Sequence, residues 1–186
     1  MNVANRSAPS ATDFFDWVAG LPEGQRYELV CGEPVAMAPE RARHSLVELD
    51  CAVTSRQALR DVGSGCTVFG DGMSVIVSED TVYEPDVVVQ CEGSIDYESA
   101  IVTRPVVLVE VLSPSTRGVD TGRKPVGYFQ LPSVSHYLVV DPESRVMTHH
   151  FHSGDGIGTA ILREGRSRLE PSGVDIEVAD VFGSLP

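Results

Sequence analysis

The sequence has little positive charge. Its 14 lysine and arginine residues face 27 aspartates and glutamates, for a formal net charge of −13, and Lys124 is the only lysine. Proteins bind nucleic-acid backbones largely through lysine and arginine, so this shortage excludes a broad basic surface. A nucleic-acid substrate would have to meet a local basic patch, and most of the acids must serve solubility or partner recognition.

Long apolar segments are missing as well. No run reaches the length of a membrane span, and residues 1–10 lack the apolar stretch of a signal peptide. We therefore expect a cytoplasmic protein with no membrane partner. The length of 186 residues suits a single α/β domain. Within it we expect a flexible segment over residues 1–12, a core over 13–151, and a C-terminal edge hairpin and tail over 152–186.

The four cysteines form no C-x-x-C pair, which excludes a zinc ribbon and a thioredoxin-like motif. We interpret all four as small buried hydrophobic residues, although their pattern does not exclude a disulfide. They are Cys31, Cys51, Cys66 and Cys91. The histidines near residue 150 are interpreted as ordinary strand residues, because only His150 and His152 would share a strand face.

Hydrophobic periodicity predicts the first regular elements. Alternation over residues 27–38 predicts a hairpin with its turn at 31–33, and apolar spacing predicts a long helix over 41–62. The side chains of this helix expected to face the core are Leu46, Leu49, Val53 and Leu59. Arg56 and Arg60 fall on the polar side and would supply a local basic patch.

Further strands are predicted over 67–69, 73–77, 86–89, 106–112, 136–140 and 145–151, with a short helix over 125–130 and an edge hairpin over 158–178. The runs at 86–89 and 106–112 are continuous and rich in β-branched residues. Such runs are typical of strands buried on both faces.

Two acidic residues interrupt these buried runs. Asp86 opens the first run, and Glu110 lies near the end of the second. Burying an unpaired carboxylate is costly, so such acids are normally paired, protonated or bound to a metal. On neighbouring strands, Asp86, Glu110 and the Val111 carbonyl would form an oxygen set that suits Mg²⁺. In the alternative structural interpretation, Asp86 caps a strand end and Glu110 pairs with Arg104 or Arg117.

Lys124 is informative because the other 13 basic residues are arginines. A compact ammonium can approach a water or a scissile phosphate in a way that a guanidinium cannot. The alternative is chance, since an arginine-rich chain can retain one lysine without a function. Together with Asp86 and Glu110, Lys124 favours a catalytic site in which it orients water or offsets developing charge.

An ordered set of short motifs runs from about Phe14 to Phe151. The set comprises Tyr27-Glu28-Leu29-Val30-Cys31-Gly32-Glu33, Met37-Ala38-Pro39, His44, Pro85-Asp86, Val109-Glu110-Val111-Leu112-Ser113-Pro114-Ser115-Thr116, Asp120, Lys124, Tyr128 and His136-Tyr137-Leu138-Val139-Val140-Asp141-Pro142. In this order the motifs closely resemble those of the Uma-two type restriction-endonuclease-like family, a branch of the PD-(D/E)XK nuclease superfamily.

The resemblance implies an α/β (α+β) restriction-endonuclease-like fold, with a central mixed sheet flanked by helices and with Asp86 and Glu110 as metal ligands. The superfamily lysine usually stands two residues after the acid, where this chain has Leu112. In this family a lysine on the following helix takes its place, and Lys124 matches it. Glu28 matches a further family acid, and His44 matches a histidine at the start of the long helix.

The helix around Lys124 decides the pocket geometry. Asp120, Lys124 and Tyr128 are spaced i, i+4, i+8 and share a helix face only if the helix begins early enough. Pro125 pushes the preceding Lys124 away from helical geometry, which favours a helix that begins at residue 125.

The expected function is a metal-dependent endonuclease that uses Mg²⁺, or Mn²⁺, to hydrolyse phosphodiester bonds, with DNA as the first substrate class. Many nucleases of this type cut both strands as dimers, so a homodimer is expected. The alternative is a catalytically inactive binding or assembly module that retains the nuclease fold. The acidic balance and Pro125 favour that alternative.

Overall fold

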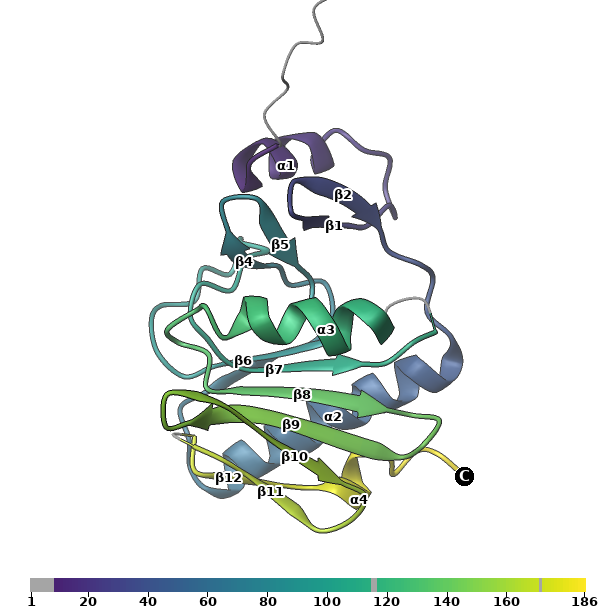
Figure 1. The fold of residues 1–186 in the computed structure, drawn as a ribbon, viewed down its shortest axis with the longest axis vertical. Helices are drawn as coiled ribbons and strands as arrows, with labels where there is room; N and C mark the ends of the chain where they lie inside the picture. Colours follow the sequence, from purple (N-terminus) through teal and green to yellow (C-terminus); the bar gives the residue numbers. More distant parts are fainter. Residues whose placement is uncertain (1–8, 115–116, 171) are drawn as a thin grey trace, which may run out of the picture.

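A six-stranded mixed sheet runs through the computed structural model, which describes residues 9–114, 117–170 and 172–186 (Figure 1). The strand order is β10-β9-β8-β7-β6-β3. The strands are β3 (Thr67–Phe69), β6 (Val87–Gln90), β7 (Pro105–Val111), β8 (His136–Asp141), β9 (Val146–Ser153) and β10 (Gly156–Leu162). β7 and β8 pair in parallel, whereas β6 and β7 pair antiparallel. Every residue of β6 and β7 is buried, as their continuous apolar runs predicted.

The two long helices, α2 (Ala42–Asp61) and α3 (Arg117–Tyr128), cover opposite faces of this sheet (Figure 1). Val47 of α2 packs in one core cluster with Val109 of β7, while Tyr128 of α3 packs in another with Leu108. The predicted architecture, a central mixed sheet flanked by helices, is therefore confirmed. None of the helices in the described part of the chain is both long and apolar enough to cross a membrane.

The face of α2 that meets the sheet differs from the prediction. The buried residues are Val47, Cys51, Ser55 and Leu59. They recur every four residues and so form one row along the helix. The residues wrongly predicted to face the core are Leu46, Leu49 and Val53, which are exposed. That prediction followed the largest apolar side chains, whereas the small Cys51 and Ser55 complete the buried row. Arg56 and Arg60 are exposed as expected.

α3 begins earlier than the sequence predicted. It starts at Arg117 and contains Pro125 in its interior, whereas a helix from residue 125 was expected. Pro125 cannot donate to the carbonyl four residues earlier and disfavours helical geometry at Lys124. Tertiary contacts hold the helix instead, among them a hydrogen bond of 2.8 Å from the Tyr137 hydroxyl to the main-chain carbonyl of Asp120.

A smaller sheet, ordered β2-β1-β5-β4, lies above α3 in Figure 1. Its strands are β1 (Tyr27–Val30), β2 (Glu33–Ala36), β4 (Val75–Ser78) and β5 (Thr81–Tyr83), and α1 (Ala11–Val18) packs beside it. The predicted hairpin is confirmed, because Cys31 and Gly32 form its turn with φ of 51° and 79°. Of the segment expected to be flexible, residues 1–8 lie outside the described part, and Ser10 caps α1.

The predicted C-terminal hairpin is divided between two sheets. β10 pairs with β9 at the edge of the large sheet, whereas β11 (Arg166–Leu169) and β12 (Val174–Glu177) form a separate two-stranded sheet. A short helix, α4 (Val178–Val181), follows. Leu169 and Ile176 pack in the same core cluster as α2. The prediction of a single edge hairpin over 158–178 was therefore wrong in its pairing.

Cys66 and Cys91 form a disulfide between the ends of β3 and β6. Thr67 pairs with Gln90, so the two cysteines occupy the next pair of opposite positions. Cys51 is buried as predicted, but Cys31 is exposed at the hairpin turn. The prediction of four buried thiols was therefore wrong for Cys31, Cys66 and Cys91.

A buried chain of hydrogen bonds links the tail to the large sheet. His136 Nδ1 lies 2.8 Å from His149 Nε2, and His149 Nδ1 lies 2.6 Å from Ser167 Oγ. His136 Nε2 contacts the main-chain carbonyl of Glu170. Burial, with a contribution from His136, lowers the pKa of His149 to about 4. His149 is therefore neutral in the folded protein at neutral pH.

We expect His149 to make stability depend on pH. The unfolded chain binds a proton at this histidine near its ordinary pKa of about 6.5, whereas the folded protein binds it near pH 4. The stability contributed by neutral His149 is complete above about pH 6.5 and is lost as the pH falls toward 4. A pH of about 5 lies near the middle of this window. When the pH falls from about 7 to about 5, the Tm of the wild type should therefore decrease more than the Tm of His149→Gln.

Thermal melts at the two pH values measure this difference, and carboxyl groups that titrate in both proteins cancel from it. The matched control is His152→Gln, because His152 is exposed and lies on the same strand. It should follow the wild type. Equal pH slopes for the wild type and His149→Gln would contradict the expectation.

Candidate functional site

Asp86 and Glu110 are neighbours across two strands. Val87 pairs with Val109 in the register of β6 and β7, which places Asp86, directly before β6, opposite Glu110. Directly opposite residues of an antiparallel pair lie on the same face. Asp86 Oδ2 also accepts a hydrogen bond of 2.5 Å from the Val111 amide. The structure therefore brings together the two acids and the Val111 main chain that the sequence singled out.

Lys124 contacts three carboxylates at once. Its Nζ lies 2.8 Å from Glu110 Oε1, 3.0 Å from Glu28 Oε1 and 3.1 Å from Asp120 Oδ1. The Tyr128 hydroxyl donates a further hydrogen bond of 2.9 Å to Glu110 Oε1. Because α3 starts early, Asp120, Lys124 and Tyr128 share its buried face, and this face meets Glu110.

Glu28 joins the cluster from the small sheet. It lies on β1, and its Oε1 also accepts the main-chain N–H of Glu84 at 3.0 Å. Lys124 thus links a carboxylate of the small sheet to one of the large sheet. The sequence resemblance marked Glu28 as a further acid, and the structure places it 3.0 Å from Lys124 Nζ.

Burial dominates the electrostatics of this cluster. Lys124, Glu110 and Asp86 are 2%, 4% and 6% exposed. Burial raises the pKa of Asp86 to about 7 and holds the pKa of Glu110 well above its ordinary value. Burial alone would lower the pKa of Lys124, but the carboxylates of Glu110 and Glu28 hold it well above the ordinary lysine value. Lys124 is therefore charged.

The cluster has more acids than it can neutralise. One ammonium faces the carboxyl groups of Glu28, Asp86, Glu110 and Asp120. Among the described residues, Asp120 Oδ2 is buried and has no hydrogen-bond partner. Buried acids are normally paired, protonated or bound to a metal ion, and Mg²⁺ takes oxygen ligands. The residues present therefore fit a hard divalent cation.

A second group of polar residues lies on the α2 side of Asp86. His44 Nε2 is 3.5 Å from Asp86 Oδ2, and His44 Nδ1 is 3.6 Å from Glu40 Oε2. Glu48 stands one turn further along α2, and burial, with the nearby carboxylates of Asp86 and Glu40, raises its pKa to about 8. Sequence reasoning found His44 but missed Glu40 and Glu48. Their spacing of four residues on either side of His44 was the available signal.

The remaining predicted residues lie away from the cluster. Arg56 stands three turns beyond His44 on α2, about 18 Å along the helix axis, and Arg60 lies further still. Neither forms a salt bridge within the part of the chain that the structure describes. They are exposed and free to meet a ligand, but not at Asp86.

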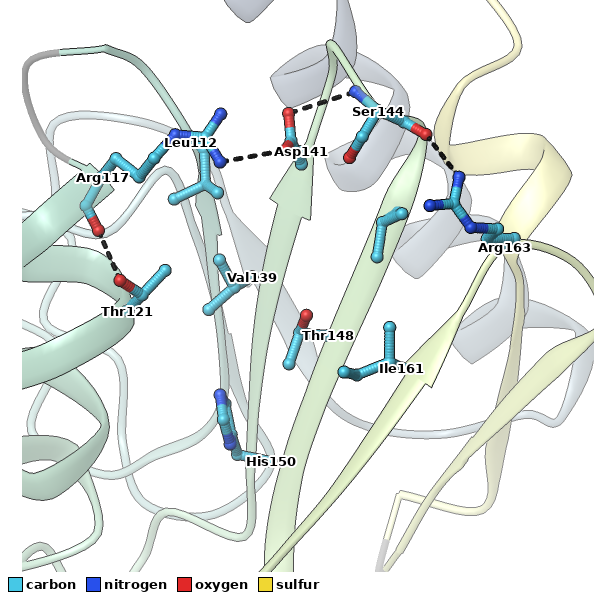
Figure 2. A pocket seen from close by; sticks show the side chains of 11 residues that line it. Leu112, Arg117, Thr121, Val139, Asp141, Ser144, Thr148, His150, Ile161 and Arg163 are labelled. Atoms are coloured by element: carbon cyan, nitrogen blue, oxygen red, sulfur yellow. Dashed lines mark hydrogen bonds and ion pairs between the residues drawn. The ribbon is translucent and has the colours of Figure 1, made fainter.

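A pocket of about 400 Å³ opens between the first turn of α3 and strands β8, β9 and β10 (Figure 2). Arg117 Nη1 donates to Asp141 Oδ2 at 3.0 Å on its rim, and Arg163 Nη1 donates to the Ser144 carbonyl at 3.2 Å. His150 of β9 also lines the pocket (Figure 2). None of the predicted site residues lines this pocket.

The chain matches the Uma2 family, described as "Putative restriction endonuclease", over residues 11–178. The chain belongs to the Uma2 family. The family predicted from the motifs is therefore confirmed. Two similar Synechocystis proteins are named "Uncharacterized protein slr1290" and "Uncharacterized protein sll1609". The first is 26% identical over 171 residues, 91% of this chain and 88% of the relative. The second is 27% identical over 135 residues, 70% of this chain and 75% of the relative.

A solved structure has a similar fold. The crystal structure of "a putative nuclease belonging to DUF820" from Anabaena variabilis superposes with a TM-score of 0.73 at 14% identity. The match covers 94% of this chain and 97% of the other. At this identity the likeness concerns the fold alone.

Proposed function

We propose that this Uma2 protein is a metal-dependent endonuclease that hydrolyses phosphodiester bonds, with DNA as its first substrate class. The observation that supports this most is the meeting of Asp86 and Glu110 in a buried cluster with more carboxylates than cations. Membership of a family described as "Putative restriction endonuclease" supports the same class of activity.

Asp86 and Glu110, with the Val111 carbonyl as a third oxygen, would hold Mg²⁺ or Mn²⁺. When bound, the ion supplies Lewis acidity, which lowers the pKa of a water ligand and stabilises charge on the phosphate. The Val111 amide fixes the carboxylate of Asp86, and the Tyr128 hydroxyl fixes that of Glu110. Both acids are thereby held in one orientation before a substrate arrives.

Lys124 has a positioning role in this proposal. An ammonium group has three N–H donors, and three carboxylates occupy them at 2.8 to 3.1 Å. In this arrangement no donor remains for a phosphate oxygen. Lys124 therefore orients Glu110, Glu28 and Asp120, and its effect on a scissile phosphate is transmitted through them.

A cleavage assay on single- and double-stranded DNA and RNA, with Mg²⁺ or Mn²⁺, tests the activity. We expect products only when a metal ion is present. Asp86→Asn purified in the same way controls for contaminating nucleases and should cleave about a thousandfold less. Absence of cleavage with either ion on any of these substrates would exclude the proposal.

Arg56 and Arg60 are proposed to contact phosphates that flank the cut. Each lost phosphate contact lowers the slope of log affinity against log salt by about one, so Arg56→Ala with Arg60→Ala should reduce it by about two. Fluorescence anisotropy in the Asp86→Asn background measures binding without cleavage. The control is Arg166→Ala with Arg168→Ala, since both arginines are already paired with acids. An unchanged slope for the α2 variant would rule out this patch.

An inactive binding or assembly module with the same fold is the second candidate. The burial of Glu110 and Lys124 favours it, because a structural ion-pair network also explains an enclosed lysine. Such a module would bind its partner in the presence of EDTA and would cleave nothing. The proposal also includes a homodimer, because an enzyme that cuts both strands needs two sites. Sedimentation velocity measures the oligomeric state. A cytoplasmic location is a further part of the proposal.

A further inference from the structure

We propose that Glu40, His44 and Glu48, together with Asp86, form a second cation site that takes a first-row divalent transition-metal ion in preference to Mg²⁺. We call these four residues the α2 site. The inference goes beyond the proposed nuclease function and does not require that the protein cleave anything.

The geometry of the ligand atoms carries the inference. Glu40, His44 and Glu48 each offer one ligand atom, and these atoms lie within 4.8 Å of one another. His44 and Glu48 stand one turn apart on α2, and Glu40 lies just before the helix begins. A cation among these atoms would have three candidate side-chain ligands within reach.

Asp86 extends the group to a fourth ligand. Its Oδ2 lies 3.5 Å from His44 Nε2, a separation too long for a hydrogen bond. The side chains of His44 and Asp86 are 11% and 9% exposed. Asp86 therefore belongs to both polar groups, with Glu110 on one side and the α2 residues on the other.

His44 lacks the contacts that a structural histidine normally makes. Its Nδ1 is buried and has no hydrogen-bond partner within the described residues. The nearest carboxylate oxygen, on Glu40, lies 3.6 Å away. Buried imidazole nitrogens are usually hydrogen-bonded or bound to a metal, so an unpartnered ring nitrogen beside two acids points to a missing ligand.

The charge of the group points the same way. Arg26 Nη1 approaches Glu40 at 3.9 Å, but Arg26 is engaged more closely with Asp71 and Glu84. Among the residues that the structure describes, Glu48 forms no salt bridge with a lysine or an arginine. A divalent cation would offset the repulsion between Glu48 and the carboxylates of Glu40 and Asp86.

The donor set selects the class of ion. Mg²⁺ favours oxygen ligands and keeps several waters, as the Asp86–Glu110 pair would allow. An imidazole combined with carboxylates suits Zn²⁺ or Co²⁺ better, because nitrogen ligands favour these ions over Mg²⁺. The two groups on either side of Asp86 thus differ in the ion that they would prefer.

Metal titration of the full chain tests the α2 site without a substrate. The protein is stripped with EDTA, exchanged into metal-free buffer and titrated with Zn²⁺ by calorimetry and with Co²⁺ by visible absorption. We expect tight binding of one equivalent, with a Co²⁺ spectrum that reports nitrogen and oxygen ligands. Mg²⁺ should displace Co²⁺ only at far higher concentration.

Variants assign the ion to this group. His44→Ala and the near-isosteric Glu48→Gln should each weaken Zn²⁺ binding about a hundredfold or more, because each removes a direct ligand. Loss of a residue that only supports a ligand already lowers metal affinity about tenfold to a hundredfold. Circular dichroism and thermal melts confirm folding, and Glu48→Gln keeps the test valid if His44→Ala unfolds. His152→Ala, an exposed histidine outside the group, should bind like the wild type.

Glu110→Gln separates this inference from the nuclease proposal. It should weaken Mg²⁺ binding and leave Zn²⁺ binding intact, because Glu110 is not part of the α2 site. The proposal is overturned if the wild type binds no Zn²⁺ or Co²⁺. It is equally overturned if binding is unchanged in both His44→Ala and Glu48→Gln, which would place the ion elsewhere.

Discussion

Asp86→Asn should lose cleavage about a thousandfold. In the absence of metal, at about pH 8 and so about one unit above the raised pKa of Asp86, the variant should nevertheless melt at a higher temperature than the wild type. The amide can still accept the hydrogen bond from the Val111 N–H, so the local geometry is preserved. What disappears is a carboxylate whose pKa burial has raised to about 7. The charged form of such a group destabilises the folded protein. This loss of stability is complete above about pH 7 and becomes smaller as the pH falls.

The stability gain of Asp86→Asn should therefore shrink between pH 8 and pH 5 (roughly one unit above and two below the raised pKa), which thermal melts in EDTA measure. Asp141→Asn provides the contrast. Partial burial alone would raise the pKa of Asp141, but hydrogen bonds from Arg117 and Ser144 hold it at about 2. Its charge stabilises the fold, so its removal should lower Tm. If Asp86→Asn is less stable than the wild type at pH 8, or cleaves normally, a metal-binding role for Asp86 is wrong.

Lys124→Ala should destabilise the protein by about 3 to 5 kcal/mol at pH 8, the usual cost of removing one partner from a buried ion pair. For a chain of this length that corresponds to roughly 10 °C in Tm. Three carboxylates lose their shared cation, and in the absence of metal they must take up protons to remain buried. Protonation becomes easier as the pH falls, so the loss should be smaller at pH 5 (about three units lower).

Lys124→Met separates charge from packing, because it keeps most of the buried stem. It should be nearly as unstable as Lys124→Ala at the same pH. Both variants should cleave poorly, because Glu110 loses its hydrogen bond from Lys124. Arg123→Ala is the matched control, as Arg123 is the preceding residue and is exposed. A Lys124→Ala protein that melts like the wild type would show that the lysine is dispensable for the fold.

The central strands could be predicted because burial leaves a simple signature. β6 and β7 are covered on both faces by α2 and α3, so nearly every residue is apolar, and Asp86 and Glu110 stand out against that background. The hairpin of β1 and β2 was equally readable, since Gly32 marks a turn with positive φ. In these places local preference and tertiary structure agree.

α3 could not be predicted because its local preferences oppose its structure. Gly118, Gly122 and Pro125 all disfavour helix, and the contacts that overcome them come from Glu110 and Tyr137, which are distant in sequence. The row of Asp120, Lys124 and Tyr128 was noticed, but its placement on one buried face depended on those contacts. Periodicity alone carries no information about them.

α2 was located correctly, but of the four residues predicted to face the core only Leu59 is buried. Leu46, Leu49 and Val53 are larger and more apolar than Cys51 and Ser55, so hydrophobicity selected the exposed residues. The same focus on apolar positions left Glu40 and Glu48 unnoticed, although each lies four residues from His44. The Cys66–Cys91 disulfide needed the register of β3 and β6, which spacing along the chain does not contain.

The position of Lys124 between the two sheets has a consequence for turnover. The small sheet supplies Glu28 and the large sheet supplies Glu110. The Lys124 ammonium contacts both carboxylates and so holds the two sheets together. In the proposed nuclease, a nucleic-acid strand would reach the buried Glu110 only after β1 and α3 separate. Turnover in such an enzyme would be gated by this opening, on the microsecond-to-millisecond timescale usual for such motions, rather than by bond cleavage. Stronger ion pairs between Lys124 and the two glutamates would then give a more stable protein with slower turnover.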